Sequence, residues 1–303
     1  MEPQTKFDVI IIGGSNSGLS AGMALGRSLF NTLIIDSGKP CNRQTPHSHN
    51  FIMHDGWTPA DMHTAAKKDV LAYPNVKYLN GTATTLTGSN NNFELTLAES
   101  DKTYQAKKVI ITTGIKDIFP DIAGFAECWG ISIIHCPYCH GYEYRDEETG
   151  ILANGDIGYD LAKLISNWTN KLTVFTNGKA TFTGEQQQVL NRNNINIIEA
   201  NITGVEHQDG YINKLQLSNG ESLALKALYA RLPFIQHTDI AEKIGYEFTE
   251  QGYIKVDMLQ KTSVQGIFAS GDCTSPMRAV SAAVASGTMA GVAAGKELME
   301  ERF

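Results

Sequence analysis

The chain has 303 residues, 42% of them hydrophobic, which is enough for two domains of ordinary size, each with a buried core. Its 25 basic and 32 acidic residues give a formal charge of −7 without a run of lysine or arginine, so nucleic-acid binding is not expected. The longest apolar runs have the length of strands, and the first strand begins too near residue 1 for a signal peptide, so we expect a cytoplasmic protein that contacts no membrane.

The N-terminal residues predict a β-α-β unit. Residues 7–12 form an apolar run that is typical of a buried strand, and a turn rich in glycine and serine follows them. A helical pattern then extends to about residue 28, and a second strand over residues 32–35 ends in Asp36. This order of elements is that of a dinucleotide-binding fold.

The next segments predict antiparallel strands. Residues 76–99 alternate between apolar and polar side chains and are interrupted by a polar turn at residues 88–92. Residues 108–111 form one further strand, which ends in Thr112-Thr113-Gly114.

A second β-α-β unit begins near residue 150. We expect strands over residues 151–152 and 171–175 with a helix over residues 158–168 between them, followed by an alternating stretch over residues 195–225. The repeated order of elements indicates two related domains.

The C-terminal part begins with residues 266–272 and continues as a long helix of small residues over 279–299. Two dinucleotide-binding units, each followed by antiparallel strands, predict an α/β fold with two Rossmann-like dinucleotide-binding domains.

The glycine-rich turn before the first helix has the composition of a phosphate-binding loop. Gly13, Gly14, Ser15 and Gly18 are small enough for the backbone to approach a pyrophosphate at the helix N-terminus. Asp36, about twenty residues further on, is expected to accept hydrogen bonds from an adenosine ribose. Ser15 replaces the middle glycine of the motif and allows a less close approach.

The Cys136-Pro137-Tyr138-Cys139 sequence is the strongest single signal for chemistry. Two intervening residues allow two sulfurs to reach disulfide distance on one turn, where one thiol attacks and the other resolves the mixed disulfide. In a reducing cytosol the five cysteines should mostly stay reduced, which favours catalysis or metal binding over a structural disulfide. The next residue, His140, is placed to shuttle a proton.

Two other kinds of site share this spacing. Cys-x-x-Cys-His is the attachment pattern of c-type haem, a chemistry that normally belongs outside the cytosol. A structural zinc site needs four ligands, and although Cys128, His135 and His140 are candidates, no second spaced cysteine pair is present. The choice among these sites therefore depends on the segments around the pair.

The order of motifs resembles the low-molecular-weight thioredoxin reductase family over essentially the whole chain. The order is phosphate cradle, Thr112-Thr113-Gly114, mid-chain Cys-x-x-Cys, second cradle and the Gly-Ile-Phe-Ala-Ser-Gly-Asp segment at 266–272. The resemblance implies an FAD-binding domain over residues 1–115 and 240–303, with a nicotinamide-type domain over residues 116–239 inserted into it. It also implies Rossmann-like domains of the three-layer ββα type and a homodimer.

The dithiol segment has a more particular resemblance. Thioredoxin reductases usually carry aspartate after the second cysteine, whereas His140 stands here, as in flavin dithiol oxidases of the gliotoxin and holomycin type. Those enzymes oxidise small dithiols and pass the electrons to oxygen. By position, Cys139 resembles the flavin-proximal sulfur, Cys136 the sulfur that exchanges with substrate, and His140 the acid/base. The expected substrate is a small dithiol or disulfide, or a thioredoxin-like protein.

Several further positions resemble the family's flavin contacts. Gly271 and Asp272 match the pair that contacts the ribityl and phosphate portion of FAD. Arg278-Ala279 matches an Arg-Gln pair near the flavin ring, with alanine in place of glutamine. The resemblance extends the flavin-contacting set to Arg43, Gln44, Asn50, Thr113 and Gly114.

The second cradle, Ala153-Asn154-Gly155-Asp156-Ile157-Gly158, departs from the family where NADPH should bind. Ala153 replaces the first glycine and crowds the turn, and Asp156 places a negative charge near the expected pyrophosphate. After the next strand the His-Arg-Arg cluster that binds the 2′-phosphate is absent, and Lys179 is the one basic residue left. No acidic residue takes its place for an NAD-type ribose contact.

Three functions follow from these features. The first, which the second cradle favours, is oxidation of a dithiol through Cys136, Cys139 and FAD with lost or weakened use of NADPH. The second is an NADPH-dependent disulfide reductase of the thioredoxin reductase type. The third is a non-enzymatic flavin-binding redox sensor, and the retention of both cysteines and His140 argues against it.

Five residues outside these motifs have no assigned role. His47, His49 and His54 cluster in a loop that we expect to line the flavin or substrate pocket rather than to bind a metal, and they are candidates to assist thiol deprotonation. Cys41 and Cys273 are expected to pack as small residues beside the cofactor segments.

Overall fold

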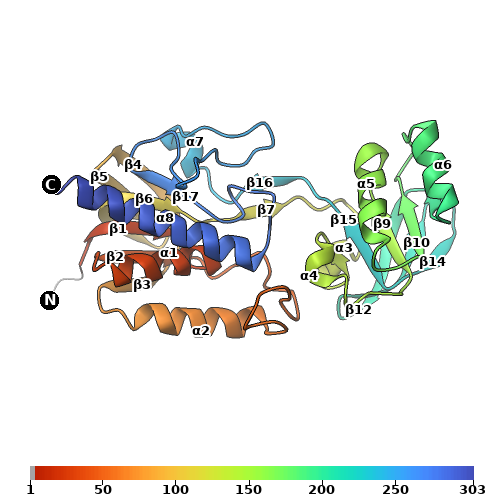
Figure 1. The fold of residues 1–303 in the computed structure, drawn as a ribbon, viewed down its shortest axis with the longest axis horizontal. Coiled ribbons are helices and arrows are strands. Elements are labelled where there is room, and N and C mark those ends of the chain that lie inside the picture. The colour runs from red at the N-terminus through yellow and green to blue at the C-terminus, as the bar shows by residue number, and fades with distance from the viewer. Residues whose placement is uncertain (1–3) are drawn as a thin grey trace. The chain divides into compact units, whose positions relative to one another are not determined.

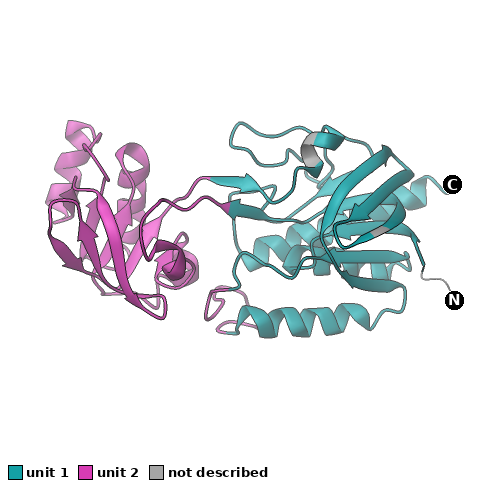
Figure 2. Cartoon of the chain, turned by 180° about the vertical axis from the view of Figure 1, so that it is seen from behind, with its two compact units in different colours: residues 1–43, 57–116, 234–303 teal, residues 44–56, 117–233 magenta. Residues whose placement is uncertain are grey.

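The structure, a computed structural model, describes residues 4–303, with the backbone only for Asp101, Ala241 and Glu242. The chain forms two compact units (Figure 2). Unit 1 contains the residues up to 43 together with 57–116 and 234–303, and unit 2 contains residues 44–56 and 117–233. The histidine-containing loop 44–56 therefore belongs with unit 2, whereas the sequence places it in the 1–115 segment.

Unit 1 is built on a seven-stranded sheet (Figure 1) that consists of β1 (Lys6–Ile12), β2 (Thr32–Asp36), β3 (Val76–Asn80), β4 (Ala83–Ser89), β5 (Asn92–Leu97), β6 (Ser100–Ile111) and β17 (Ile267–Ala269). The order is β3-β2-β1-β6-β5-β4, and β17 pairs with β6. Strands β1, β2, β3, β6 and β17 run parallel, so their carboxyl ends share one edge of the sheet. Ile12 pairs with both Ile35 and Ile111, which brings the turns after β1, β2 and β6 together at that edge.

The helices of unit 1 are α1 (Asn16–Arg27), α2 (Pro59–Leu71), α7 (Ile240–Ile244) and α8 (Val280–Glu300). Helix α8 lies close against α1 because its buried face is made of small residues. A Cβ at Gly287 would overlap the backbone of Ser17, and a Cβ at Gly291 would lie 2.6 Å from the carbonyl oxygen of Ala21. This packing places α8 against the first turn of α1, directly after the first cradle.

Unit 2 combines a parallel and an antiparallel sheet. The parallel sheet has the order β11 (Asn196–Ile198), β10 (Leu172–Phe175), β9 (Thr149–Leu152), β15 (Ala227–Ala230) and β8 (Ile133–Ile134). The antiparallel sheet consists of β12 (Ile202–Gln208), β13 (Tyr211–Leu217) and β14 (Ser222–Ala224). The helices are α3 (Phe125–Cys128), α4 (Pro137–His140), α5 (Gly155–Ile165) and α6 (Gly184–Arg192). Among residues 4–303, no helix is long and apolar enough to cross a membrane.

The chain passes between the two units near β7 (Ile115–Asp117) and β16 (Phe234–Gln236), which pair with each other. The main segment of unit 2 is thus inserted between residues 116 and 234 of unit 1. Each unit has a set of parallel strands in which one strand, β1 or β9, leads through a turn into a helix, which is the dinucleotide-binding arrangement. The predicted α/β fold with two Rossmann-like domains is confirmed.

One helix begins elsewhere than the sequence predicts. The helix of the second unit is expected over residues 158–168, whereas α5 spans Gly155–Ile165. It begins earlier because the side chain of Asn154 accepts a hydrogen bond from the Gly155 amide and so acts as the N-cap. The position of this cap also affects the second cradle, as described below.

Candidate functional site

The first cradle is the turn between β1 and α1 in unit 1. Gly13 has φ +109°, and a Cβ there would overlap the carbonyl oxygen of Thr112 on the neighbouring strand. A Cβ at Gly18 would overlap the carbonyl oxygen of Gly13. Only glycine therefore lets the turn, the helix and β6 approach this closely, as a dinucleotide cradle requires.

The N-terminus of α1 is chemically suited to an anion. Ser15 is the N-cap, but its side chain makes no capping hydrogen bond, and the first turn of α1 carries no acidic residue. The first amides of a helix have no partner within the helix, and the helix dipole adds positive potential there. A pyrophosphate placed at this turn would accept hydrogen bonds from these amides and would interact favourably with the positive end of the helix dipole.

Asp36 at the end of β2 is fixed by two hydrogen bonds. One carboxylate oxygen accepts the Gly14 amide at 3.0 Å, and the other accepts the Tyr78 hydroxyl at 2.6 Å. Burial and the nearby carboxylate of Asp36 raise the pKa of Tyr78, so it remains a hydrogen-bond donor. Lys67 of α2 lies 3.5 Å from the centre of the Tyr78 ring. Sequence reasoning missed Tyr78 and Lys67, because Tyr78 reaches Asp36, and Lys67 reaches Tyr78, only in the folded chain.

The residues after β6 and β17 leave room for a bound group. Thr113 has a buried hydroxyl oxygen without a hydrogen-bond partner, and Gly114, at φ +67°, has no atom within 4 Å of where a Cβ would be. Asp272 lies 4.0 Å from the Arg278 Nε, and it accepts a hydrogen bond from the Cys41 thiol at 3.6 Å. Together with the first cradle, these features fit an FAD molecule held by unit 1.

The predicted flavin contacts divide between the two units. The structure brings the following into unit 1: Gly13, Gly14, Ser15, Gly18, Asp36, Arg43, Thr113, Gly114, Gly271, Asp272, Arg278 and Ala279. Gln44 and Asn50 belong to unit 2, where the Gln44 side chain donates to the Ala126 carbonyl oxygen at 3.2 Å. For the residues of both units, contact with the flavin stays a prediction.

The dithiol lies in unit 2 at the start of the short helix α4. Cys136 is its N-cap, and the Cys139 thiol donates to the Cys136 sulfur, with 2.8 Å between the two Sγ atoms. The hydrogen bonds from the Cys139 thiol and from the Cys139 and Tyr138 amides lower the pKa of Cys136 to about 7, against the opposing effect of burial. The lowered pKa raises the thiolate fraction of Cys136 at neutral pH, which suits Cys136 to be the attacking or leaving sulfur of the pair.

His140 ends helix α4 directly after the second cysteine. Burial, and secondarily the charge of His49, lowers the pKa of His140 to about 4. His140 is therefore neutral at physiological pH, and its lowered pKa makes it a weaker base than an exposed imidazole. Burial, and secondarily the charge of Cys136, raises the pKa of Tyr229 in β15.

The rim of the dithiol is aromatic. Tyr138, between the two cysteines, is 62% exposed and stands edge-on to Trp168, with ring centres 5.5 Å apart. Tyr142 is 67% exposed and stacks under Arg145. These side chains offer an apolar contact surface beside the reactive sulfurs.

The histidine loop contacts the segment after α4. His49 lies 3.4 Å from Asp55 and 3.5 Å from Glu143, whereas His47 pairs with the Gly56 carbonyl oxygen at 2.9 Å. Among the residues that the structure describes, no three His, Cys, Asp or Glu side chains group around a possible metal position. Glu143, to which the sequence assigns no chemistry, is thus a neighbour of the loop.

The two remaining cysteines of unit 1 differ in exposure. Cys273 is fully buried, and burial raises its pKa to about 12. Cys41 is exposed and donates to Asp272, a predicted FAD contact. Both lie beside cofactor segments, as expected, and a buried thiol with a raised pKa is unreactive.

In the second cradle, one backbone amide at the N-terminus of α5 is already hydrogen-bonded to a side chain. Asn154 Oδ1 accepts the Gly155 amide at 2.8 Å and the Thr181 amide at 2.9 Å, and its Nδ2 donates to the Lys179 carbonyl oxygen at 2.8 Å. Asp156 in the first turn of α5 accepts a hydrogen bond from Gln186 at 2.7 Å. The first amide of α5 thus has a side-chain acceptor, and a carboxylate lies in the first turn of the helix.

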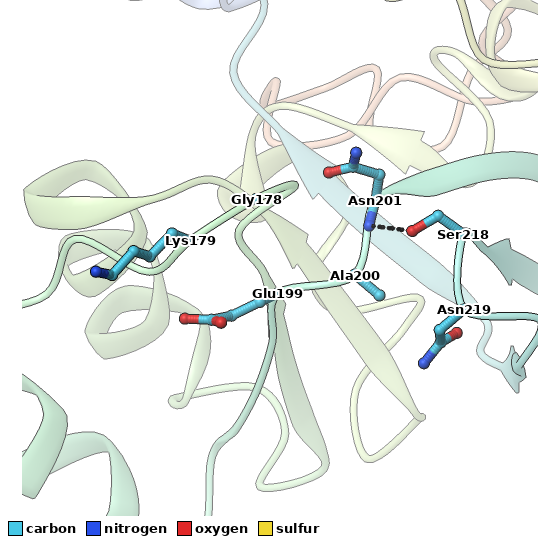
Figure 3. Close-up of a pocket in the computed structure, with 7 residues that line it drawn as sticks. All are labelled: Gly178, Lys179, Glu199, Ala200, Asn201, Ser218 and Asn219. Carbon is cyan, nitrogen blue, oxygen red and sulfur yellow. Dashed lines mark hydrogen bonds between the residues drawn. The ribbon is translucent and has the colours of Figure 1, made fainter.

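The loop after β10 carries an acidic neighbour that sequence reasoning missed. Glu199 follows β11, and its carboxylate accepts the Ala180 amide at 2.8 Å. Figure 3 shows Glu199 and Lys179 beside a shallow pocket, which is lined by Gly178, Lys179, Glu199, Ala200, Asn201, Ser218 and Asn219. A carboxylate at this position opposes binding of a 2′-phosphate.

Comparison with known proteins agrees with this architecture. The model of the pyridine nucleotide-disulphide oxidoreductase family matches residues 7–287. The chain is 31% identical to thioredoxin reductase sirT of Leptosphaeria maculans, over 94% of this chain and 92% of that protein. It is 30% identical to thioredoxin reductase tcpT of Claviceps purpurea, over 99% of this chain and 97% of that protein. An oxidoreductase from Agrobacterium tumefaciens, known as a crystal structure, is 34% identical with a TM-score of 0.91, over 97% of this chain and 99% of that one.

The match spans both Rossmann-like units and the dithiol between the two cradles. The family implies a flavin cofactor, and the features of unit 1 described above fit FAD. The chain belongs to the pyridine nucleotide-disulphide oxidoreductase family, as a thioredoxin reductase-like oxidoreductase.

Proposed function

We propose that this protein is an FAD-dependent dithiol oxidase that takes electrons from a small dithiol through Cys136 and Cys139 and does not use NADPH. The observation that carries this proposal is the difference between the two cradles. The N-terminus of α1 is open to a pyrophosphate, whereas that of α5 is capped by Asn154 and carries Asp156. The dithiol keeps every group that thiol exchange needs.

The reaction begins with the enzyme disulfide. A substrate thiolate attacks Cys136 Sγ, the Cys136–Cys139 bond breaks, and the electron pair of that bond remains on Cys139. The second substrate thiol gives its proton to neutral His140 and attacks the substrate sulfur of the mixed disulfide. Cys136 leaves as a thiolate, which its lowered pKa favours, and the substrate departs as a disulfide.

The cofactor completes the cycle. FAD, held by the first cradle and Asp36, would supply a two-electron acceptor for the Cys136 and Cys139 thiols, and molecular oxygen is the proposed final acceptor. The net reaction of one dithiol with one oxygen molecule then gives one disulfide and one hydrogen peroxide. We further propose that the enzyme works as a cytoplasmic homodimer.

A small substrate suits the rim of the site better than a protein substrate does. Tyr138 and Tyr142 provide exposed aromatic surface beside the sulfurs. Aromatic contacts of this kind bind a compact apolar dithiol without an extended docking face. A thioredoxin-like protein is the second candidate, because the fungal relatives are named thioredoxin reductases.

Oxygen consumption by the FAD-loaded enzyme tests the proposed reaction. With dithiothreitol as the small dithiol, we expect oxygen uptake and an equal amount of hydrogen peroxide, lost in the Cys136→Ser variant. NADPH with oxidised thioredoxin should give no turnover. Thioredoxin reduction by NADPH would establish the reductase instead, and failure of every dithiol to reduce the flavin would favour a non-enzymatic sensor.

A further inference from the structure

Helix α2 contacts one residue of strand β3 with two of its side chains. His63 and Lys67 are four residues apart and therefore lie on the same face of α2. The His63 ring meets the Tyr78 ring edge-on, with ring centres 6.5 Å apart, and the Lys67 Nζ lies 3.5 Å from the centre of the same ring. The Tyr78 side chain thus joins α2 to the sheet of unit 1.

The backbone of Gly14 in the first cradle is held on both of its polar groups. Its amide donates to Asp36 Oδ1 at 3.0 Å, and its carbonyl oxygen lies 3.1 Å from His63 Nε2. A carbonyl oxygen only accepts hydrogen bonds, so the Nε2 of this imidazole carries a proton. The Tyr78 hydroxyl donates to Asp36 Oδ2 at 2.6 Å and lies 3.5 Å from the same His63 nitrogen. These four residues form a closed ring of polar contacts.

This ring fixes the direction of a backbone amide at the start of α1. A Cβ at Gly14 would lie 2.7 Å from both the Asp36 Cβ and the Tyr78 hydroxyl oxygen, so the contacts around Gly14 are tight. The carbonyl and the amide of one peptide unit point in opposite directions, so the bond from His63 to the Gly14 carbonyl directs the Ser15 amide away from α2. Ser15 is the N-cap, and its amide is one of the four that lack a partner within the helix.

We propose that His63 and Tyr78 are positioning residues that fix the first cradle for the adenosine diphosphate half of FAD. They act through the two groups that they bond, the Gly14 backbone and the Asp36 carboxylate. Groups that are already fixed lose less freedom when a ligand binds, so the cofactor is held more tightly. This inference rests on the FAD binding that is part of the proposed function, and it holds whichever donor reduces the flavin.

The affinities of the full-length protein for FAD and for ADP test the inference together. After bound FAD is removed, FAD binding is followed by flavin fluorescence, and ADP, which is the adenosine diphosphate half alone, is measured by competition. Tyr78→Phe keeps the ring but loses the bond to a charged acceptor, so both FAD and ADP should bind about tenfold more weakly. His63→Leu loses a bond to a neutral carbonyl, so it should weaken both to a smaller extent.

Two matched variants separate positioning from a loss of packing. In His63→Gln, the side-chain amide carries an N–H near the position of the imidazole Nε2, so the FAD and ADP affinities should stay close to those of the unmodified protein. Thr64→Val is the control on α2, because Thr64 is exposed and its hydroxyl donates within the helix to the Ala60 carbonyl oxygen at 2.8 Å. It should leave both affinities unchanged.

Unchanged FAD and ADP affinities in both Tyr78→Phe and His63→Leu, with the unfolding temperature preserved, overturn the inference and leave FAD binding intact. Weaker FAD binding with unchanged ADP binding also overturns it, because the effect would then arise at the flavin end of the cofactor. If His63→Leu does not fold, Tyr78→Phe alone decides. An unmodified protein that binds neither FAD nor ADP would contradict the inference and the FAD dependence of the proposed function together.

Discussion

The two cradles of this chain occupy the same place in the same kind of fold but present different chemistry. Both follow the first strand of a β-α-β unit, and both have a glycine where helix and strand meet, Gly18 and Gly158. The N-cap Ser15 leaves the first turn of α1 open, whereas the N-cap Asn154 covers that of α5. A Rossmann-like domain can thus keep its fold while side chains fill its anion site.

The two units also differ at the end of the strand that follows each cradle helix, which is β2 in unit 1 and β10 in unit 2. At the end of β2, Asp36 is held by Gly14 and Tyr78 with lone pairs still available for a ribose. After β10, the Glu199 carboxylate is tied to the loop that should bind a 2′-phosphate. The strand ends therefore differ between the two units as the helix N-termini do, and unit 2 carries the dithiol.

The largest expected effect comes from removing the Cys136 sulfur, which should stop the reaction at the dithiol of unit 2 without changing how much FAD unit 1 binds. Cys136→Ser should reduce dithiol-driven flavin reduction to background, because the attacking and leaving sulfur is gone. Its FAD content should match that of the unmodified protein. Stopped-flow absorbance with dithiothreitol measures the rate, and rapid bleaching in this variant would show that electrons reach the flavin without the dithiol.

Paired glycine substitutions test the cradles directly. In Gly18→Ala the new Cβ overlaps the Gly13 carbonyl oxygen, which should cost about 1–3 kcal/mol in unit 1 and remove most bound FAD. Gly158→Ala introduces a Cβ 3.0 Å from the Ala153 carbonyl oxygen but should leave the FAD content unchanged. The ratio of flavin to protein absorbance measures both. Equal FAD loss in the two variants would remove the distinction between the cradles.

The pH dependence of the dithiol tests the electrostatics of unit 2. The pKa of Cys136 is lowered to about 7, so its thiolate forms above that pH and is lost below it. Iodoacetamide should therefore alkylate Cys136 of the reduced protein with a midpoint near pH 7. In Cys139→Ala the largest stabilising hydrogen bond is gone, and the midpoint should move up. A midpoint that stays in place would assign the low pKa to another group.

The smallest expected effect comes from reopening the second cradle. Asn154→Gly frees the Gly155 amide, and Glu199→Gln removes a charge beside Lys179. Each change near a helix end or phosphate is worth about 0.3–1 kcal/mol, so NADPH binding should tighten a few-fold in the double variant. Fluorescence titration with NADPH measures it, with Gln187→Ala, an exposed residue of α6, as the control. No change in the double variant would show that other residues exclude NADPH.

Local sequence patterns were sufficient to predict much of the fold and part of the site. Alternation and glycine turns predict the strands, and the spacing of Cys136 and Cys139 predicts their contact. The predicted start of α5 at residue 158 was wrong, because the pattern of apolar residues does not show that Asn154 caps the helix at Gly155.

The remaining site residues meet only through the folded chain. Tyr78 reaches Asp36 from a neighbouring strand, and Glu199 reaches the loop after β10 in the same way. Glu143 meets His49 across about ninety residues of sequence, and no periodicity or motif encodes such a contact.

The central claim is that electrons enter this protein from a dithiol and not from a nicotinamide. The most direct measurement is anaerobic mixing of the FAD-loaded protein with dithiothreitol, NADPH or NADH, followed by the flavin absorbance. We predict rapid bleaching by dithiothreitol and none by either nicotinamide at micromolar concentration. Fast bleaching by micromolar NADPH or NADH would contradict the account.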